Sequence, residues 1–124
     1  MAAHRKPRKV RTLSDVEAAW VGAMIDGEGS IYRCVGRSPY RMDFANTEVE
    51  LVATMLRLVG SGCVGYVNGK PSERRAFIKH IKDAWRWYLY PINDIAALLE
   101  QIAPYSIKAQ KWLPDVLAFA GTKR

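Results

Sequence analysis

The feature that most constrains this chain is a short helix with an unusual flank and an unusual end. Ser14 and Glu17 form a capping box, which predicts a helix from Ser14 to Ile25. Small residues recur on it at four-residue spacings, so another helix can approach one flank closely. These residues are Ala18, Ala19, Gly22 and Ala23. The helix then runs into Asp26-Gly27-Glu28-Gly29, which places two carboxylates at its negative end.

These two carboxylates require a compensating charge. The C-terminal end of a helix favours cations over anions by about 0.3–1 kcal/mol for each charge. A bound divalent ion with oxygen ligands is the natural compensation, and the glycines leave backbone carbonyls open to the same ion. Asp-Gly and Glu-Gly pairs are also ordinary turn sequences. The spacing by itself therefore leaves a metal site and a plain turn both open.

Hydrophobic periodicity and turn residues divide the rest of the chain into alternating elements. Thr47 and Glu50 form a second capping box, and Gly60 ends the helix that it opens. The predicted elements after the first helix are strands over 30–35 and 40–45, a helix over 47–59, strands over 63–67 and 84–90, a helix over 93–103 and a helix over 106–121. This order, αββαββαα, predicts an α+β domain with an antiparallel four-stranded sheet packed under helices.

The charge of the chain is concentrated at its beginning. The chain has 124 residues, one domain by length, with 19 Lys and Arg against 12 Asp and Glu. Five of these cations lie in the first eleven residues, where there is no acid. We therefore expect a basic arm over residues 1–12, a single domain over 13–124 and a polyanionic partner. Sequence leaves open whether the arm contacts nucleic acid or is a disordered tail.

The remaining composition excludes several classes of protein. Two cysteines are too few for a disulfide scaffold. The two cysteines and two histidines do not have the spacing of a common zinc module. The N-terminus has no apolar signal segment, and no stretch is long enough to span a membrane. We expect a soluble intracellular protein, of a bacterial cytoplasm or an organelle, with no membrane partner.

The stretch from Trp20 to Ser30, WVGAMIDGEGS, resembles the signature of the LAGLIDADG homing endonucleases. Later landmarks of that family are matched, in the right order, by Asn46-Thr47-Glu48, Gly60 and Gly62, the Trp-rich strand over 84–90, and Pro104-Tyr105 with Lys108 and Gln110. The resemblance implies that two signature helices pack side by side at a two-fold axis, with their C-terminal ends directed at the scissile phosphates. One copy of the signature implies a homodimer, with Ala18, Ala19, Gly22 and Ala23 at the interface.

The same resemblance assigns the catalytic residues. It implies that Glu28 binds the metal, that the Gly27 carbonyl assists it, and that Asp26 belongs to the catalytic set in a more structural role near the helix end. Asn46 matches a polar position at the edge of the family's site. The implied cofactor is Mg²⁺, for which Mn²⁺ can substitute, while Ca²⁺ supports binding without cleavage. The family often has a lysine just before the third helix, where this chain has Tyr90-Pro91-Ile92-Asn93. Arg86, Lys79 or Lys108 substitutes for it, or the role is absent.

Double-stranded DNA is then expected to lie against the open face of the sheet. Polar residues alternate with apolar ones in the strands, and arginine suits guanine edges while aspartate accepts from cytosine N4. The predicted DNA contacts are Ser30, Tyr32, Cys34, Arg41, Asp43, Arg86 and Tyr88 on the sheet, with Lys79 and Lys108 outside it. Solvation of an exposed sheet face is the alternative for any one of them. The alternation directs Arg33 inward, where it has no evident role.

The resemblance therefore implies an intron-encoded, site-specific homing endonuclease. It would make a double-strand break in a long pseudo-palindromic DNA target by divalent-metal-dependent phosphodiester hydrolysis. The alternative is a binding protein of the same fold without this activity, either a catalytically inactive DNA-binding regulator or an RNA-binding intron maturase. The intact Asp26 and Glu28 favour cleavage, and the missing lysine favours the alternative.

Overall fold

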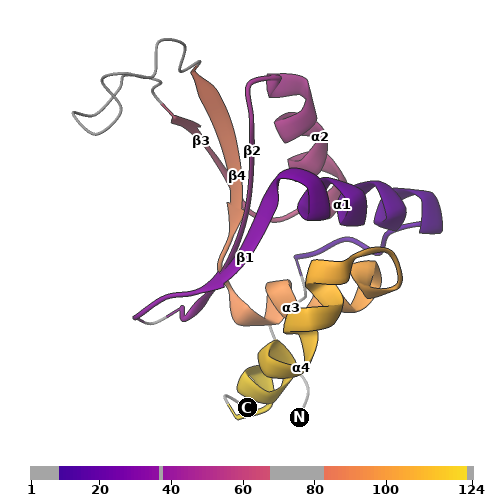
Figure 1. Ribbon diagram of the computed structural model, residues 1–124, viewed down its shortest axis with the longest axis vertical. Helices are drawn as coiled ribbons and strands as arrows, with labels where there is room; N and C mark the ends of the chain where they lie inside the picture. Colours follow the sequence, from indigo (N-terminus) through magenta and orange to yellow (C-terminus); the bar gives the residue numbers. More distant parts are fainter. Residues whose placement is uncertain (1–8, 37, 68–82, 123–124) are drawn as a thin grey trace.

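The structure is a computed structural model that describes residues 9–36, 38–67 and 83–122. Its elements are α1 (Asp15–Glu28), β1 (Gly29–Arg33), β2 (Tyr40–Asn46), α2 (Val49–Val59), β3 (Cys63–Val67), β4 (Ala84–Leu89), α3 (Ile92–Ile102), the 3-10 turn η3 (Ala103–Tyr105) and α4 (Ile107–Thr122). The four strands form one antiparallel sheet in the order β1-β2-β4-β3. The helices among the described residues all lie on one side of this sheet, and no described element covers its other face, called the open face below (Figure 1). The α+β fold and the predicted order of elements are confirmed.

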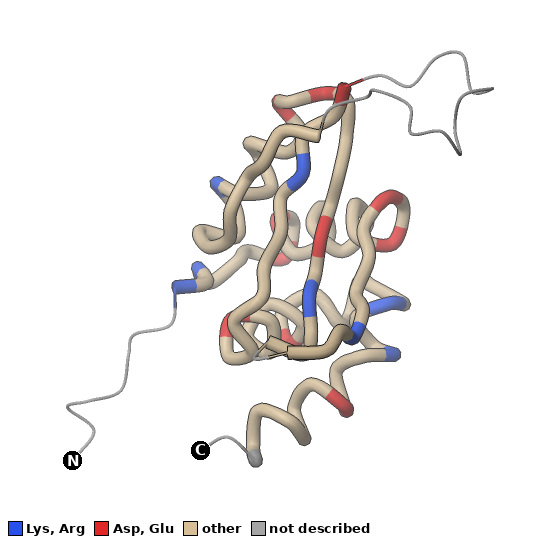
Figure 2. Tube along the Cα trace, turned by 90° about the vertical axis from the view of Figure 1, so that its left-hand side faces the viewer, with Lys and Arg blue, Asp and Glu red and all other residues tan. Residues whose placement is uncertain are grey.

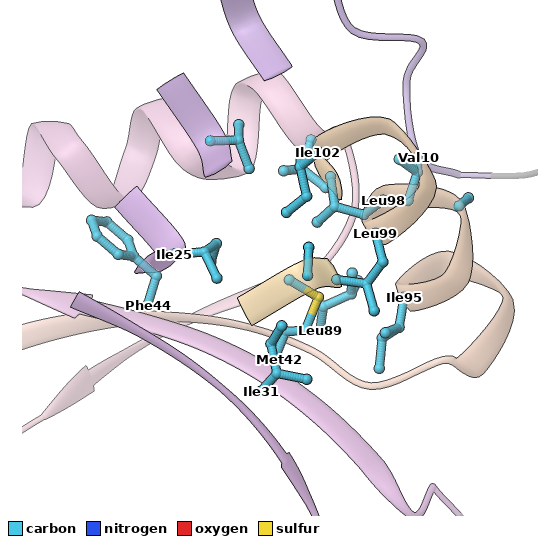
Figure 3. Close-up of a cluster of buried hydrophobic side chains, with 14 of the residues drawn as sticks. Val10, Ile25, Ile31, Met42, Phe44, Leu89, Ile95, Leu98, Leu99 and Ile102 are labelled. Atoms are coloured by element: carbon cyan, nitrogen blue, oxygen red, sulfur yellow. The ribbon is translucent and has the colours of Figure 1, made fainter. Parts of the chain in front are cut away.

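The core fills the space between the inner face of the sheet and the helices. Met42 and Phe44 of β2 and Trp87 and Leu89 of β4 are completely buried there. They meet apolar side chains from the helices, of which Figure 3 labels Ile25, Ile95, Leu98, Leu99 and Ile102. Because side chains in a strand alternate between faces, burial of these residues leaves the intervening polar ones on the open face.

Only one of the two predicted capping boxes forms. The Ser14 hydroxyl accepts from the Glu17 amide at 3.1 Å, and the Glu17 carboxylate accepts from the Ser14 amide at 2.9 Å. The box at Thr47 is wrong, because α2 begins at Val49 and has no side-chain cap. The Asn46 side chain accepts from the Glu48 amide at 2.8 Å instead, so a turn after β2 takes the place of the cap.

Residues 9–13 pack against the domain as a short strap. Val10 is buried in the core. The Arg11 amide donates to the Val59 carbonyl at 2.9 Å, and its guanidinium donates to the Leu58 carbonyl at 2.9 Å, at the end of α2. Gln101 of α3 donates to the Arg11 carbonyl at 3.0 Å. The predicted arm over 1–12 therefore includes residues that belong to the packed domain, while residues 1–8 lie outside the described chain. In the described ranges, no helix is long and apolar enough to cross a membrane.

Candidate functional site

Asp26 lies in the last turn of α1, but its carboxylate is directed onto the start of α4. It accepts hydrogen bonds from the Ser106 hydroxyl at 2.8 Å, the Ile107 amide at 2.9 Å and the Lys108 amide at 3.1 Å. These donors lie at the positive end of α4, where a carboxylate is favoured. Ser106, which is buried, also accepts from the Ala109 amide at 3.0 Å. Asp26 is thus a cap of α4, about 80 residues away in the sequence.

Lys108 makes the complementary interaction at the end of α1. Its ammonium donates to the Gly29 carbonyl at 2.7 Å and to the Ile25 carbonyl at 3.3 Å. The last turn of α1 contains no basic residue of its own, so this ammonium supplies the cation that the two carboxylates require. The helix-dipole argument for a metal ion therefore no longer stands, because a side chain already provides the compensation.

Glu28, the last residue of α1, is exposed at the point where the chain enters β1. Its carboxylate accepts a hydrogen bond from the side-chain amide of Asn46, at the end of β2. Asn46 is held in turn by the bond from the Glu48 amide to its side-chain oxygen, which directs its NH₂ group to Glu28. The structure therefore brings together Glu28 and Asn46, two of the residues expected in the catalytic set, and directs the third, Asp26, elsewhere.

The donor set at this end of α1 suits a hard divalent cation. Glu28 offers a carboxylate and Gly27 a backbone carbonyl, and oxygen ligands of this kind are those that Mg²⁺ prefers. Within the described residues, no group of three or more His, Cys, Asp or Glu side chains comes together. Of the two carboxylates in the last turn of α1, Glu28 is the one that does not cap α4, and a site with one such carboxylate fits Mg²⁺ because that ion completes its shell with water and substrate phosphate oxygens.

The capping role of Asp26 has a measurable dependence on pH. Burial raises the pKa of Asp26, but hydrogen bonds from the Ile107 and Lys108 amides and from Ser106 outweigh it, so the pKa lies below its usual 3.8. A lowered pKa means that the charged form stabilises the fold above the usual value, and that this stabilisation is lost as the pH falls.

We therefore expect Asp26→Asn to lower the free energy of unfolding by about 1 kcal/mol at pH 7, the usual scale for a weakened helix cap. Urea unfolding at pH 7 and pH 2 measures the difference, which should shrink at the lower pH. Asp115→Asn, at an exposed position of the same helix, is the control and should change little at either pH. If Asp26→Asn differs from the wild type by the same amount at both pH values, the capping role is contradicted.

The open face of the sheet carries a continuous set of polar side chains. Ser30 faces Asp43 and Tyr32 faces Arg41 across β1 and β2, and Asp43 faces Tyr88 across β2 and β4. Arg86 lies one alternate position further along β4 and is exposed. Figure 2 views the protein from this side and shows basic and acidic positions mixed on the face. Six of the predicted DNA contacts thus share one surface: Ser30, Tyr32, Arg41, Asp43, Arg86 and Tyr88.

Asp43 lies at the centre of this set and is only partly exposed. Burial raises the pKa of Asp43 above its usual 3.8, and the charge of Arg86 and a hydrogen bond from Tyr32 offset only part of this rise. A carboxylate held among these donors repels phosphate and accepts from a neutral donor, which is the requirement for contact with a base edge.

The other predicted DNA contacts lie elsewhere. Cys34 follows β1 in the turn to β2, where its thiol donates to the Ser38 carbonyl at 3.4 Å. Lys108 is engaged with the end of α1, away from the open face. Lys79 lies outside the described residues.

Arg33 is directed to the inner side as predicted, and its guanidinium lies 5.5 Å from the centre of the Tyr40 ring, a cation–π contact that explains it.

The four small residues of α1 divide between two faces. Ala18 and Gly22 are buried inside the chain itself. A Cβ at Gly22 would lie 3.1 Å from the Tyr105 carbonyl oxygen, so the close approach at this glycine is made by η3 of the same chain. Ala19 is half-buried and Ala23 is exposed, on a flank that also carries the exposed Val16. Only Ala19 and Ala23 are therefore accessible to a second molecule.

Two contributors to this region were not foreseen from the sequence. A serine just before a helix, such as Ser106, is a capping signal that the sequence does show. Its hydrogen bond to Asp26, from a distant part of the chain, could not be predicted from the sequence. Gln101 of α3 accepts from the Leu13 amide at 2.6 Å and donates to the Arg11 carbonyl, which fixes the chain before α1. No local pattern marks a glutamine for this role.

The fold is that of the homing endonucleases: a four-stranded antiparallel sheet with an open face, and α1 ending at its edge. The chain is similar to the crystal structure of the homing endonuclease I-CvuI in complex with its target in the presence of Ca²⁺ (TM-score 0.61, 16% identity, 88% of this chain and 71% of that chain). It is equally similar to I-CvuI in complex with the I-CreI target in the presence of Mg²⁺, with the DNA not cleaved (TM-score 0.61, 15% identity, 87% and 70%). No protein-family model matches the sequence, and no curated protein matches it. At this identity the similarity establishes the fold.

Proposed function

We propose that the protein is a site-specific DNA endonuclease of the LAGLIDADG homing endonuclease family that acts as a homodimer. One observation carries the proposal: α1 ends in an exposed carboxylate, Glu28, held by Asn46 at the end of β2, the strand that carries Arg41 and Asp43 on the open face. An acid at this place can reach the backbone of a duplex whose bases lie against Arg41, Asp43 and Arg86. The similarity to DNA-bound I-CvuI supports the same arrangement.

The catalytic roles follow from the partners of each residue. Glu28 would hold the divalent cation together with the Gly27 carbonyl, and Asn46 keeps the Glu28 carboxylate in place. The chemistry that Mg²⁺ supplies in nuclease sites is activation of water and stabilisation of charge on the phosphate oxygens. Asp26 positions α1 through its bonds to α4 rather than by binding the cation. We expect Mn²⁺ to substitute for Mg²⁺, and Ca²⁺ to support binding without cleavage.

A homodimer follows from the number of carboxylates. Each chain offers one Glu28, whereas a double-strand break requires hydrolysis on both strands. The exposed flank of α1 at Ala19 and Ala23 is the surface where a second α1 can approach. Two copies so related place two Glu28 side chains near one axis and extend the open faces of the two sheets to either side.

The sheet sets the length and symmetry of the target. A strand rises about 3.3 Å per residue, close to the roughly 3.4 Å between base pairs along a DNA strand. A ribbon of roughly seven to nine residues therefore covers about as many base pairs, and a dimer about twice that number. The proposed target is long and nearly palindromic.

Selection of cleavable sites from a randomised DNA library tests two proposals together: that the protein is a nuclease, and that the open face of the sheet reads the DNA sequence. Wild-type protein with Mg²⁺ should enrich a nearly palindromic sequence. Arg86→Ala should relax the preference at one symmetric pair of positions, since a bidentate contact to guanine contributes about 1–3 kcal/mol of discrimination. Arg57→Ala removes an exposed arginine from α2 and should leave the preferred sequence unchanged. No enrichment by the wild type would overturn the nuclease proposal. An unchanged preference in Arg86→Ala would overturn the proposal that the open face of the sheet reads the DNA sequence.

A DNA-binding regulator without cleavage activity is the second candidate. Two observations favour it: residues 90–93 contain no lysine, and Lys108, a candidate to replace that lysine, donates to two backbone carbonyls. Nicking of a supercoiled plasmid that carries the bound sequence, with Mg²⁺ or with EDTA, distinguishes the two. Tight binding without nicking would select the regulator.

A further inference from the structure

The ends of α1 and α4 exchange capping groups of opposite charge. Asp26 of α1 accepts from the amides of Ile107 and Lys108 at the start of α4. Lys108 of α4 donates its ammonium to the carbonyls of Ile25 and Gly29 at the end of α1. Each helix therefore supplies the charge that the dipole of the other favours. We call these two side chains the reciprocal clamp.

The clamp encloses the turn that carries Glu28. The two carbonyls held by Lys108 lie on either side of Gly27 and Glu28 in the sequence. Gly27 is a poor helix former, and a Cβ at this position would meet nothing within 4 Å, so no packing at Gly27 itself holds this part of the turn. The Gly29 amide donates to the Ile25 carbonyl and closes the helix, and Lys108 binds that same carbonyl.

We infer that Lys108 is a positioning residue for Glu28, which fixes the last turn of α1 before any metal or DNA is bound. This inference rests on the proposed function for its effect on catalysis, but the clamp itself does not depend on it. Lys108 acts through the backbone of the Glu28 turn, and it does not touch the scissile phosphate. The compensating cation at the end of α1 is thus built into the chain.

Hydrogen exchange of the protein alone tests the clamp without metal, DNA or activity. Lys108→Met keeps the length of the side chain and removes its charge. We expect the backbone amides of residues 26–30 to exchange at least about ten times faster in this variant, with exchange in β2 and β4 unchanged. Lys111→Met, an exposed lysine one turn further along α4, is the matched control and should show no change. Unchanged exchange in Lys108→Met would overturn the inference.

Kinetics then separate positioning from direct contact with the substrate. We expect Lys108→Met to lower kcat for cleavage at least about ten-fold with KM for DNA within about two-fold, and Lys108→Arg to restore most of kcat, because a guanidinium can donate to the same carbonyls. If Lys108→Met does not fold, Lys108→Gln takes its place in both measurements, with Lys108→Arg still expected to resemble the wild type. A loss of kcat with normal exchange would mean that Lys108 contacts the substrate. If the wild type does not cleave DNA, the proposed function fails, while the exchange result still decides the clamp.

Discussion

Glu28→Gln should bind the DNA target within a few fold of the wild-type affinity and cleave it at least about 100-fold more slowly, since even residues that only orient metal ligands contribute up to this factor. The amide keeps the size of the side chain and an oxygen that can accept from Asn46, so the end of α1 should keep its structure. What it loses is the negative charge that holds a divalent cation. Binding is measured by gel shift in Ca²⁺ and cleavage by single-turnover kinetics in Mg²⁺.

Two controls make this result specific to the site. Glu100→Gln makes the same chemical change at an exposed position of α3 and should alter neither binding nor cleavage. Asn46→Ala keeps the Glu28 charge but removes the hydrogen bond that holds the Glu28 carboxylate. Cleavage should therefore fall by a smaller factor than in Glu28→Gln. If Glu28→Gln loses binding and cleavage equally, Glu28 is a structural residue and the catalytic assignment fails.

Ala23→Leu should convert the proposed homodimer into a monomer. A leucine at this exposed position has ample space in a single chain, but it would lie in the closest part of a crossing between two α1 helices. Overpacking of this kind costs about 1–3 kcal/mol at each site, and a two-fold interface has the substitution twice. Sedimentation equilibrium of the wild type and the variant measures the effect. Ala53→Leu, the same change at an exposed position of α2, should leave the dimer intact.

Gly22→Leu does not serve the same purpose. A Cβ at Gly22 already lies within 3.1–3.2 Å of the Tyr105 backbone and Cβ, so a leucine would destabilise the chain itself. A loss of dimer in that variant would therefore not locate the interface. A wild-type protein that is dimeric, with Ala23→Leu equally dimeric, would place the interface on another surface.

The sequence was sufficient wherever a structure depends on near neighbours in the chain. The Ser14 box spans three residues and forms as predicted. Gly60 ends α2 in the left-handed conformation, at φ 78°, which glycine adopts without strain. Alternation in β2 and β4 correctly separated the buried side chains from the open polar face, because a strand has a period of two.

Near neighbours were misleading where a distant group competes for the same atoms. The predicted Thr47 capping box does not form. The Asn46 side chain instead accepts from the Glu48 amide in the turn after β2 and donates to Glu28 of α1. The predicted end of the first helix was three residues early, because Lys108 binds carbonyls in a turn that glycine would otherwise weaken. Asp26 was given a more structural role near the helix end, and only the structure shows that its partner is the start of α4.

The sequence by itself therefore determined the order of the elements, the two faces of the sheet and a first helix that leads toward Glu28. Only the tertiary structure decided that, of the two carboxylates at the end of α1, Asp26 caps α4 and Glu28 stays exposed. Arg33 acquires its role from Tyr40 across the hairpin, and Lys108 from carbonyls about 80 residues away. A helix end or a ring face attracts any charge that folding brings near it, so its partner is set by the three-dimensional path of the chain and not by spacing along it.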